Sequence, residues 1–466
     1  MTFAKRTAAF LLTLVLTVSI CTLAVSAETD AFTPVLRFIA AIDTHVRDDN
    51  DTTQQRIGKM LRLGYAAAAA DPVYRKLDAV LIAGDLTHDG TRTEFQKFRD
   101  AVNGSLRDST QLLGVVAHNH DGYAMRQREV RRVYTEMTGN DADIHVVING
   151  FHFIGISVSS REALYYDAGQ RRWLKQQLNE AVADDPDKPI FVFHHEHVFN
   201  TVYGSSLYAG WGLPFFTDIL RQYPQVVDFS GHSHYPLNDP RSLWQGAFTA
   251  VGTGAIYYTE MTVGAVRTYH PADAYDVATC WIVEADTAGN LRLRGMDVNA
   301  GKGLCEYRLD NPADPANRAY TPAKRKAAST APVFTAGDTL RVTERDGKTV
   351  LQIPAAKPTD GMPVVLYRVS VCNASGVTVF RDWTMPQYYT AAGQDTVDYT
   401  VSGVPAGTYT VRVTAETAYG VPSEPLETQV QVGFRLCPYC RQQHTGVWGC
   451  LLTLFHRIAF VFDRHG

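Results

Sequence analysis

The chain has 466 residues, of which 45% are hydrophobic, 20% charged and 11% aromatic. This balance excludes a collagen-like, low-complexity or mainly disordered protein, and the length predicts two or three domains with sizeable cores. The formal net charge is −4 and no basic tract is long enough to follow a nucleic-acid backbone, so we expect no nucleic-acid scaffold as a partner.

Residues 1–27 have the pattern of a secretory signal peptide: a short basic start, an apolar run and small residues before the end. Cleavage after Ala27 is expected. Lipid attachment at Cys21 is disfavoured because the large Ile20 precedes it, and an uncleaved membrane anchor is the alternative to cleavage. The pattern therefore predicts a secreted, extracellular protein.

A first domain, which we place at residues 28–310, is predicted to be of the α/β class, because short apolar runs alternate with helical patterns. The apolar runs are 35–42, 79–84, 112–117, 144–148, 151–158, 190–194, 226–230 and 248–251. The helical patterns are around 54–70, 93–102, 126–138, 169–182 and 214–222. The pair Asn149-Gly150 between two runs predicts a hairpin, so we expect an antiparallel pair within the sheet.

The second half of the chain changes character. Residues 311–330 are polar, basic and rich in Ala and Pro, which is typical of a linker. In residues 331–432 short strand-like runs are separated by Gly, Pro, Asn and Asp, and this pattern predicts an all-β sandwich domain. Residues 407–425 resemble the last hairpin of a fibronectin type III module, so we expect a fibronectin type III-like fold there.

The last segment, residues 433–466, is an apolar tail that contains cysteine and histidine. It carries ligand types at nearly the spacing of a small zinc knuckle: Cys437, Cys440, His444 and Cys450. Thiols of an exported protein also tend to form disulfides, so zinc and a disulfide both stay open. Residues 451–462 are too short to span a membrane, and we expect an amphipathic helix that contacts the cell surface or the membrane interface.

Nine of the 15 histidines fall within five short stretches: 43–45, 84–88, 118–121, 194–197 and 231–234. Each stretch follows an apolar run, so its polar side chains would lie at strand ends, where open α/β sheets bind ligands. Imidazole and carboxylate groups suit first-row divalent ions, and a bridging carboxylate can hold two of them close together. One such stretch alone is more often a solvated turn, but five together predict a dinuclear metal site.

In order and spacing, these stretches resemble the five-block signature of calcineurin-like metallophosphoesterases. The matching segments are Asp43-Thr44-His45, Gly84-Asp85, Asn119-His120-Asp121, His194 and Gly231-His232-Ser233-His234. The resemblance covers residues 34–300 and implies a four-layer α/β/β/α sandwich with two metals at the rim of its sheets. Iron, manganese, zinc, nickel and cobalt, in divalent or trivalent form, all stay open as the metals.

The resemblance also implies a role for each residue of the blocks. One metal would be held by Asp43, His45, Asp85 and His234. The other would be held by Asp85, which bridges the two, and by Asn119, His194 and His232, with His195 as the alternative to His194. His120 would donate a proton to the leaving oxygen or stabilise its charge, and Asp121 would orient the His120 ring.

The implied reaction is hydrolysis of a phosphoester, either a monoester or a diester, by a hydroxide that bridges the two metals. His88 and Arg241 are candidate contacts for the substrate phosphate, although Arg241 is at least as well explained as a solvated surface side chain. His118 replaces the family's usual glycine and is a candidate extra ligand. Two alternatives stay open: a surface-binding protein that keeps the fold without turnover, and a metallohydrolase that acts on another ester or an amide.

Overall fold

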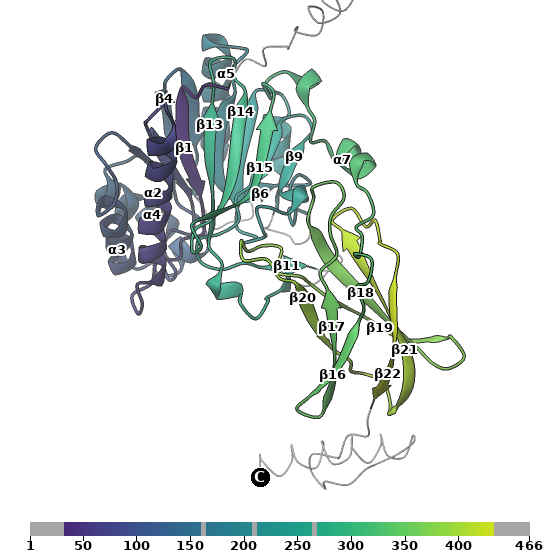
Figure 1. Ribbon diagram of the computed structural model, residues 1–466. Coiled ribbons are helices and arrows are strands. Elements are labelled where there is room, and N and C mark those ends of the chain that lie inside the picture. Colours follow the sequence, from purple (N-terminus) through teal and green to yellow (C-terminus); the bar gives the residue numbers. More distant parts are fainter. Residues whose placement is uncertain (1–31, 160–164, 207–211, 263–267, 433–466) are drawn as a thin grey trace, which may run out of the picture.

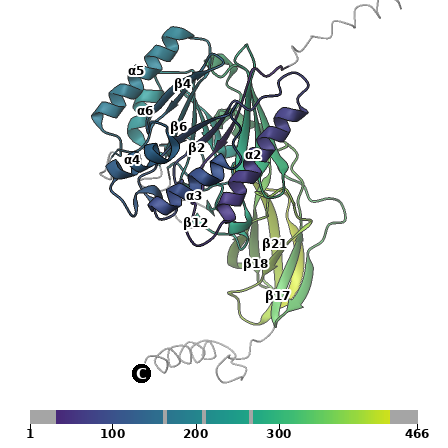
Figure 2. The same ribbon diagram turned by 90° about the vertical axis from the view of Figure 1, so that its left-hand side faces the viewer.

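The computed structural model describes residues 32–159, 165–206, 212–262 and 268–432. These residues form an α/β part, followed by an elongated part that contains only strands (Figures 1 and 2). The predicted signal peptide and the tail with Cys437, Cys440, His444 and Cys450 lie outside the described residues. Within the described ranges, the structure contains no helix that is both long enough and apolar enough to cross a membrane.

Two β-sheets pack face to face in the α/β part. The first has the strand order β15-β14-β13-β1-β2-β3, and the second has the order β4-β5-β6-β8-β10-β9, with β7 beside β6. The strands of the first sheet are β1 (Leu36–Ala41), β2 (Ala79–Ala83), β3 (Gln111–Val115), β13 (Thr279–Ala285), β14 (Leu291–Asp297) and β15 (Lys302–Leu309). The strands of the second are β4 (Ile144–Ile148), β5 (Phe151–Gly155), β6 (Ile190–Val198), β7 (Gly212–Leu213), β8 (Val226–Gly231), β9 (Leu243–Gln245) and β10 (Thr249–Gly252).

The main core lies between these two sheets. The Phe38 ring from β1 contacts the rings of Phe153, Phe191 and Phe229, with centroids 4.9 to 5.7 Å apart. The predicted hairpin is confirmed, because Asn149 and Gly150 join β4 and β5 with φ angles of 52° and 78°. Such left-handed values are those that a two-residue hairpin turn requires.

Helices cover the outer face of each sheet. The helices α2 (Thr52–Ala70), α3 (Arg92–Asn103) and α4 (Gln127–Thr138) lie together beside β1 (Figure 1). Their residues Ile57, Phe95 and Val130 share a buried cluster with residues of the first sheet. The helices α5 (Ala168–Asp184) and α6 (Pro214–Leu220) form a similar cluster with the second sheet. The predicted four-layer α/β/β/α sandwich is therefore confirmed.

The C-terminal part consists of two antiparallel sheets with a common core. One has the order β16-β17-β20 and the other the order β19-β18-β21-β22. Their strands are β16 (Arg341–Arg345), β17 (Lys348–Pro354), β18 (Val364–Cys372), β19 (Thr378–Thr384), β20 (Thr396–Thr400), β21 (Gly407–Thr417) and β22 (Leu426–Val432). Leu351, Val369 and Val413 are buried between the sheets, as expected for the predicted all-β sandwich. The resemblance to a fibronectin type III module stays a prediction.

The segment between the two parts, predicted as a linker, packs on the α/β part. It contains the short helix α7 (Pro322–Ala328). The guanidinium groups of Arg318 and Arg325 donate hydrogen bonds to backbone carbonyls of Ala247 and Leu243, respectively. Because both arginine side chains are buried against these carbonyls, the segment fixes where the β-sandwich begins.

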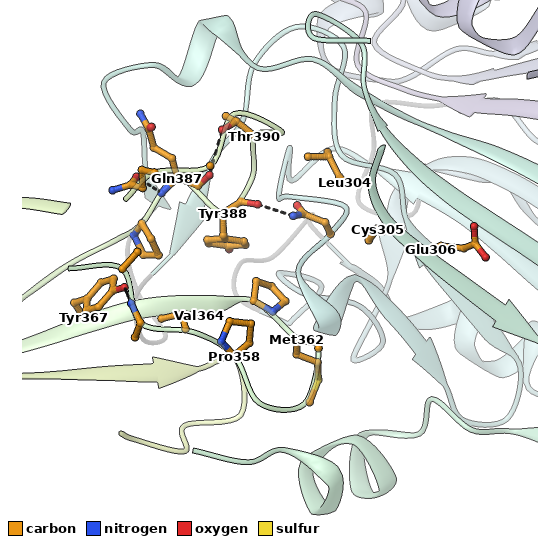
Figure 3. A pocket seen from close by; sticks show the side chains of 18 of the residues that line it. Leu304, Cys305, Glu306, Pro358, Met362, Val364, Tyr367, Gln387, Tyr388 and Thr390 are labelled. Atoms are coloured by element: carbon orange, nitrogen blue, oxygen red, sulfur yellow. Dashed lines mark hydrogen bonds between the residues drawn. The ribbon is translucent and has the colours of Figure 1, made fainter. Parts of the chain in front are cut away.

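A loop of the β-sandwich, residues 385–391 between β19 and β20, docks on the α/β part. The Asn238 amide donates to the Tyr388 carbonyl at 2.6 Å (Figure 3), and the Tyr389 hydroxyl donates to Asp273 at 2.7 Å. We call residues 385–391 the docking loop. It borders a cavity of about 470 Å³ whose lining comes from both parts of the chain, including Leu304, Met362, Val364 and Tyr388.

Replacing Asp273 with alanine is expected to weaken this docking. Asp273 accepts hydrogen bonds from Gln387 and from the buried Tyr389 hydroxyl, so its removal leaves the hydroxyl without this acceptor. We expect a loss of about 1 to 3 kcal/mol in the free energy of unfolding, measured by chemical denaturation. Asp398→Ala is the control, because Asp398 forms an exposed ion pair with Arg345, and such pairs contribute about 0 to 1 kcal/mol. Equal losses in the two variants would contradict the docking role.

Candidate metal centre

The predicted ligands lie where strands of both sheets end. β1 and β2 are parallel neighbours in one sheet, and β6 and β8 are parallel neighbours in the other. Asp43 and Asp85 follow β1 and β2, and the His232 backbone N–H after β8 donates to Asp43 Oδ2 at 3.0 Å. This bond joins the two sheets at one edge. The sheet packing therefore brings together blocks that are far apart in the sequence.

One group of potential ligands consists of Asp43, His45 and His234. Their ligand atoms all lie within 4.8 Å of one another. His45 Nε2 and His234 Nε2 are 3.3 Å apart, and they lie 3.8 and 3.5 Å from Asp43 Oδ1. These are the three residues, besides the bridging carboxylate, that were predicted to hold the first metal.

A second group consists of Asp85, His195 and His232. His195 Nε2 lies 3.2 Å from Asp85 Oδ2 and 3.1 Å from His232 Nδ1. The Asn119 amide is also in this group, with Nδ2 2.7 Å from Asp85 Oδ2. Asp85 Oδ2 is in addition 3.8 Å from His45 Nε2, so Asp85 lies between the two groups, as predicted for a bridging carboxylate.

The prediction of His194 as a ligand is wrong, and the alternative His195 takes its place. His194 Nε2 lies 2.7 Å from Asp228 and its ring packs on Phe216 of α6. Successive side chains of a strand point to opposite faces, so only one of the two histidines can face the other sheet. His195 continues the face of Phe191 and Phe193, which fills the core between the sheets. Both faces of β6 are buried, and the sequence therefore offers no polar alternation that would distinguish them.

The absence of a side chain at Gly84, directly after β2, allows His195 to approach the end of that strand. Gly84 has a φ of 88°, and a Cβ atom at this position would lie 2.6 Å from His195 Nδ1. Such a contact is too short for any side chain, so the glycine of the Gly84-Asp85 block is required for the approach of the ligand.

Asp121 does not orient the His120 ring, contrary to prediction. Asp121 Oδ1 accepts hydrogen bonds from the Thr87 N–H and hydroxyl at 2.9 and 2.8 Å, and Oδ2 accepts from the Ala117 N–H at 2.9 Å. The carboxylate thus braces the loops after β2 and β3. The His120 ring is held instead by the backbone carbonyl of His88, 2.7 Å from Nδ1. Backbone carbonyls carry no sequence signal, so this partner was not predictable.

Of the two predicted phosphate contacts, His88 lies at the metal centre, whereas Arg241 is bonded to another residue. The rings of His88, His45 and His120 are neighbours, with potential ligand atoms within 4.8 Å. Arg241 instead donates to both carboxylate oxygens of Asp239, at 2.8 and 2.6 Å, and its guanidinium stacks on the Tyr203 ring. The prediction of Arg241 as a phosphate contact is therefore corrected.

His118, the candidate extra ligand, has its own partners. Its Nδ1 is bonded to the buried carboxylate of Glu196, and its ring stacks on Tyr165 with centroids 4.0 Å apart. Burial raises the pKa of Glu196, but the hydrogen bond and charge of His118, together with the charges of further histidines nearby, outweigh it and lower the pKa to about 2. His118 is thereby held beside the second group rather than within it.

The backbone around the ligands is strained. Five potential ligands have positive φ, between 42° and 69°: Asp43, His45, Asp85, His232 and His234. Among the described residues, only four other non-glycine positions share this feature. Such conformations cost about 1 to 3 kcal/mol each and persist where the surrounding structure enforces them, typically at functional sites.

The donor set fits a pair of metal ions. Buried oxygens of Asp43, Asp85 and Asn119, and Nδ1 of His45, have no hydrogen-bond partner among the residues that the structure describes. Unpaired buried polar atoms are costly, and a bound cation satisfies oxygen atoms of this kind. Carboxylates, an amide and imidazoles are also the ligand types that first-row transition metals accept.

Burial tunes the protonation of these ligands. It lowers the pKa of His232 to about 4 and of His234 to about 3, and it lowers the pKa of His45 well below its usual range. These three imidazoles are therefore neutral near pH 7, which is the form that binds metal. For His195 the effect of burial is instead outweighed by the charges of Asp85 and Asp43, which raise its pKa well above its usual range. Burial, together with the charge of Asp85, raises the pKa of Asp43 well above its usual range. A bound cation favours the ionised carboxylate.

Sequence reasoning missed the segment that closes the other side of the centre. The Tyr257 N–H donates to the Asp43 carbonyl at 3.1 Å, and the Tyr258 carbonyl lies 3.1 Å from His234 Nδ1. Both contacts orient the first group of ligands. The segment Ile256-Tyr257-Tyr258 contains neither a charged residue nor a histidine, so no residue pattern marked it as part of a metal centre.

Comparison with known proteins agrees with this geometry. The sequence pattern of the calcineurin-like phosphoesterase family matches residues 37–236. This segment is a calcineurin-like phosphoesterase domain. The domain is thus that of a metal-dependent phosphoric ester hydrolase. It carries all the residues of both ligand groups.

Individual relatives are more distant. The "Probable glycerophosphodiester phosphodiesterase GpdQ" of Arcobacter nitrofigilis is 28% identical over 207 residues, which are 41% of this chain and 69% of that protein. Purple acid phosphatase PPD1 from yellow lupin (Lupinus luteus) seeds is 13% identical with a TM-score of 0.42, over 59% of this chain and 53% of the lupin chain. GAP50 of Plasmodium is 13% identical with a TM-score of 0.38, over 59% of this chain and 89% of the GAP50 chain. The alignment thus spans about half of the lupin phosphatase.

Separate alanine substitutions of His194 and His195 test which of them is a metal ligand. We expect His195→Ala to lose at least one of two bound metal ions, because His195 lies within the second group of ligands. His194→Ala is the matched control and should keep the metal content of the wild type, because His194 contacts Asp228 and Phe216 instead. Metal content is measured by mass spectrometry of purified protein, with circular dichroism to verify folding. Metal loss confined to His194→Ala would restore the original prediction.

Proposed function

We propose that the protein is an exported phosphodiesterase that uses two transition-metal ions to hydrolyse a phosphoester outside the cytoplasm. The observation that carries this proposal is the pair of ligand groups that share Asp85 as a common neighbour. Iron, manganese, zinc, nickel and cobalt all remain candidates for the metals. Two bound cations supply a water nucleophile that is active near neutral pH and offset charge on the phosphoryl oxygens.

The residues of the chain would bind the two ions and donate a proton to the leaving group. Asp43, His45 and His234 would hold one ion and Asn119, His195 and His232 the other, with Asp85 between them. The His88 carbonyl accepts a hydrogen bond from His120 Nδ1, so His120 Nε2 is the atom that can deliver a proton to the leaving oxygen.

The position of His88 supports a role in substrate binding. Its ring centroid is 5.1 Å from that of His120 and 5.7 Å from that of His45, and these two rings are 4.3 Å apart, so His88 lies beside both the proton donor and the first ligand group. We infer that His88 contacts the phosphate while its carbonyl orients His120. One residue would thus couple substrate position to proton transfer.

Cleavage of a diester is supported by the relative from Arcobacter nitrofigilis, whose name describes a glycerophosphodiester phosphodiesterase. Export is supported by the signal-peptide pattern of residues 1–27. We further infer that residues 331–432 are a fibronectin type III-like module and that the tail, residues 433–466, contacts the cell surface. A nucleic-acid scaffold is not among the expected partners.

Two substitutions test the roles of the bridge and of the proton donor. Asp85→Asn should lose metal and activity together, because Asp85 lies between both groups. His120→Asn should keep both ions and lose about 10²- to 10⁴-fold in kcat, the usual contribution of general acid catalysis. His145→Asn serves as control, because His145 is bonded to Gln177 and His152 on the hairpin β4–β5. Full activity of Asp85→Asn would contradict the proposal.

The diester preference is tested with bis(p-nitrophenyl) phosphate and p-nitrophenyl phosphate, which release the same phenolate. After removal of bound metal by a chelator, the protein should be inactive, and reconstitution with the correct metal should restore turnover. We expect kcat/KM to be higher for the diester. A higher value for the monoester would assign the protein as a phosphatase, and no turnover with any metal would favour a surface-binding protein that retains the fold.

A further inference from the structure

Two tyrosine rings lie against the first group of metal ligands, and a third tyrosine packs on both of them. The Tyr257 ring centroid is 5.1 Å from that of His45, and the Tyr258 centroid is 4.1 Å from that of His234. Tyr275 contacts both tyrosines, at 5.5 and 5.1 Å. We call Tyr257, Tyr258 and Tyr275 the tyrosine cluster. Its rings continue outward from the metal ligands without an intervening residue.

The tyrosine cluster is fixed relative to the metal centre by main-chain contacts. The Tyr257 N–H donates to the Asp43 carbonyl, and the Tyr258 carbonyl is bonded to His234 Nδ1. The buried guanidinium of Arg56, from α2, donates to the carbonyls of both Tyr257 and Tyr275. One side chain therefore joins the two segments that carry the cluster. Pre-organised rings of this kind lose little entropy when a ligand binds.

Part of this aromatic surface is open to solvent. Tyr275 is 55% exposed, and Tyr257 and Tyr258 are half-buried. On the side of the proton donor, the Tyr123 ring is 4.7 Å from His120 and is 56% exposed. Contiguous exposed apolar surface often marks a binding site, and here exposed aromatic rings flank the reacting groups on two sides.

The tyrosine cluster presents aromatic ring faces to a substrate more than it presents polar groups. The Tyr258 hydroxyl already donates to Glu260 at 3.0 Å, and the same carboxylate oxygen is 2.7 Å from His270 Nε2. Because this hydroxyl and this carboxylate satisfy each other, they are poorly placed to recognise the hydroxyl groups of a small alcohol such as glycerol. A planar ring on the substrate would find complementary aromatic faces instead.

We propose that the tyrosine cluster is a subsite that stacks on a planar ring of the substrate, so that the preferred ester carries an aromatic or nucleobase group. This inference rests on the proposed phosphoesterase activity. It assigns the specificity of that activity to Tyr275 in particular, the most exposed ring of the cluster. Stacking of one base on an aromatic side chain contributes about 1 to 3 kcal/mol, which corresponds to roughly 5- to 150-fold in affinity.

The test measures binding without turnover. The probes are an adenosine phosphonate, in which a carbon–phosphorus bond replaces the ester, and the same ribose phosphonate without the base. Calorimetry on the metal-loaded protein should give a Kd at least about 5-fold lower for the adenosine compound. In Tyr275→Ala this ratio should fall toward one while the Kd of the base-free compound stays unchanged. The main-chain carbonyl that Arg56 binds is retained in this variant.

Controls separate this inference from the proposed function. Tyr409→Ala, in β21 of the β-sandwich, should keep the wild-type ratio. Equal affinity of the wild type for both phosphonates, or a base effect that persists in Tyr275→Ala, would overturn the subsite. Hydrolysis of the methyl diester of adenosine 5′-phosphate is measured in parallel. Base-dependent binding with no hydrolysis would leave the subsite standing and contradict the phosphoesterase function, and hydrolysis without a base effect would do the reverse.

Discussion

Two buried carboxylates at the meeting edge of two sheets are the constraint on which the site depends. Asp43 and Asp85 are fully shielded from solvent, and both lie within 4 Å of the same His195 nitrogen. Like charges in such a place repel each other, and the shared His195 imidazole, whose pKa despite burial the two carboxylates raise well above its usual range, offers them a single compensating charge. A pair of cations resolves the conflict. The same constraint accounts for the left-handed backbone at the ligands, because only a strongly enforced fold holds these donors together.

The β-sandwich is attached to the loops that carry this chemistry. Asn238, which bonds to the docking loop, lies four residues after His234 in the chain. Asp273, which accepts from Tyr389, lies two residues before Tyr275 of the tyrosine cluster. Met261 packs with Tyr389 in a small buried cluster. The C-terminal part therefore contacts the loop that follows His234 and the segment that carries Tyr275. A movement between the two parts would displace these two segments, which lie beside the metal centre.

Much of the architecture was readable from local patterns. Apolar runs and helical periodicities report which residues are buried within one element, and the Asn149-Gly150 turn needs only its own two residues. The blocks around Asp43, Asp85 and His232 were readable for the same reason, since each lies in a short stretch after a strand. The sequence alone thus determined the α/β class, the all-β part and most of the ligand types, and the resemblance to the metallophosphoesterase family added the sandwich.

The tertiary structure decided what depends on register and on distant backbone. Whether His194 or His195 faces the metals follows from the side of β6 that meets the other sheet, and both sides are buried. The partner of His120 is a carbonyl of His88, and Arg241 turned to Asp239. The tyrosine cluster arises from segments brought beside Asp43 by packing. Such choices are set by contacts between elements, whereas a sequence pattern records only the periodicity within each one.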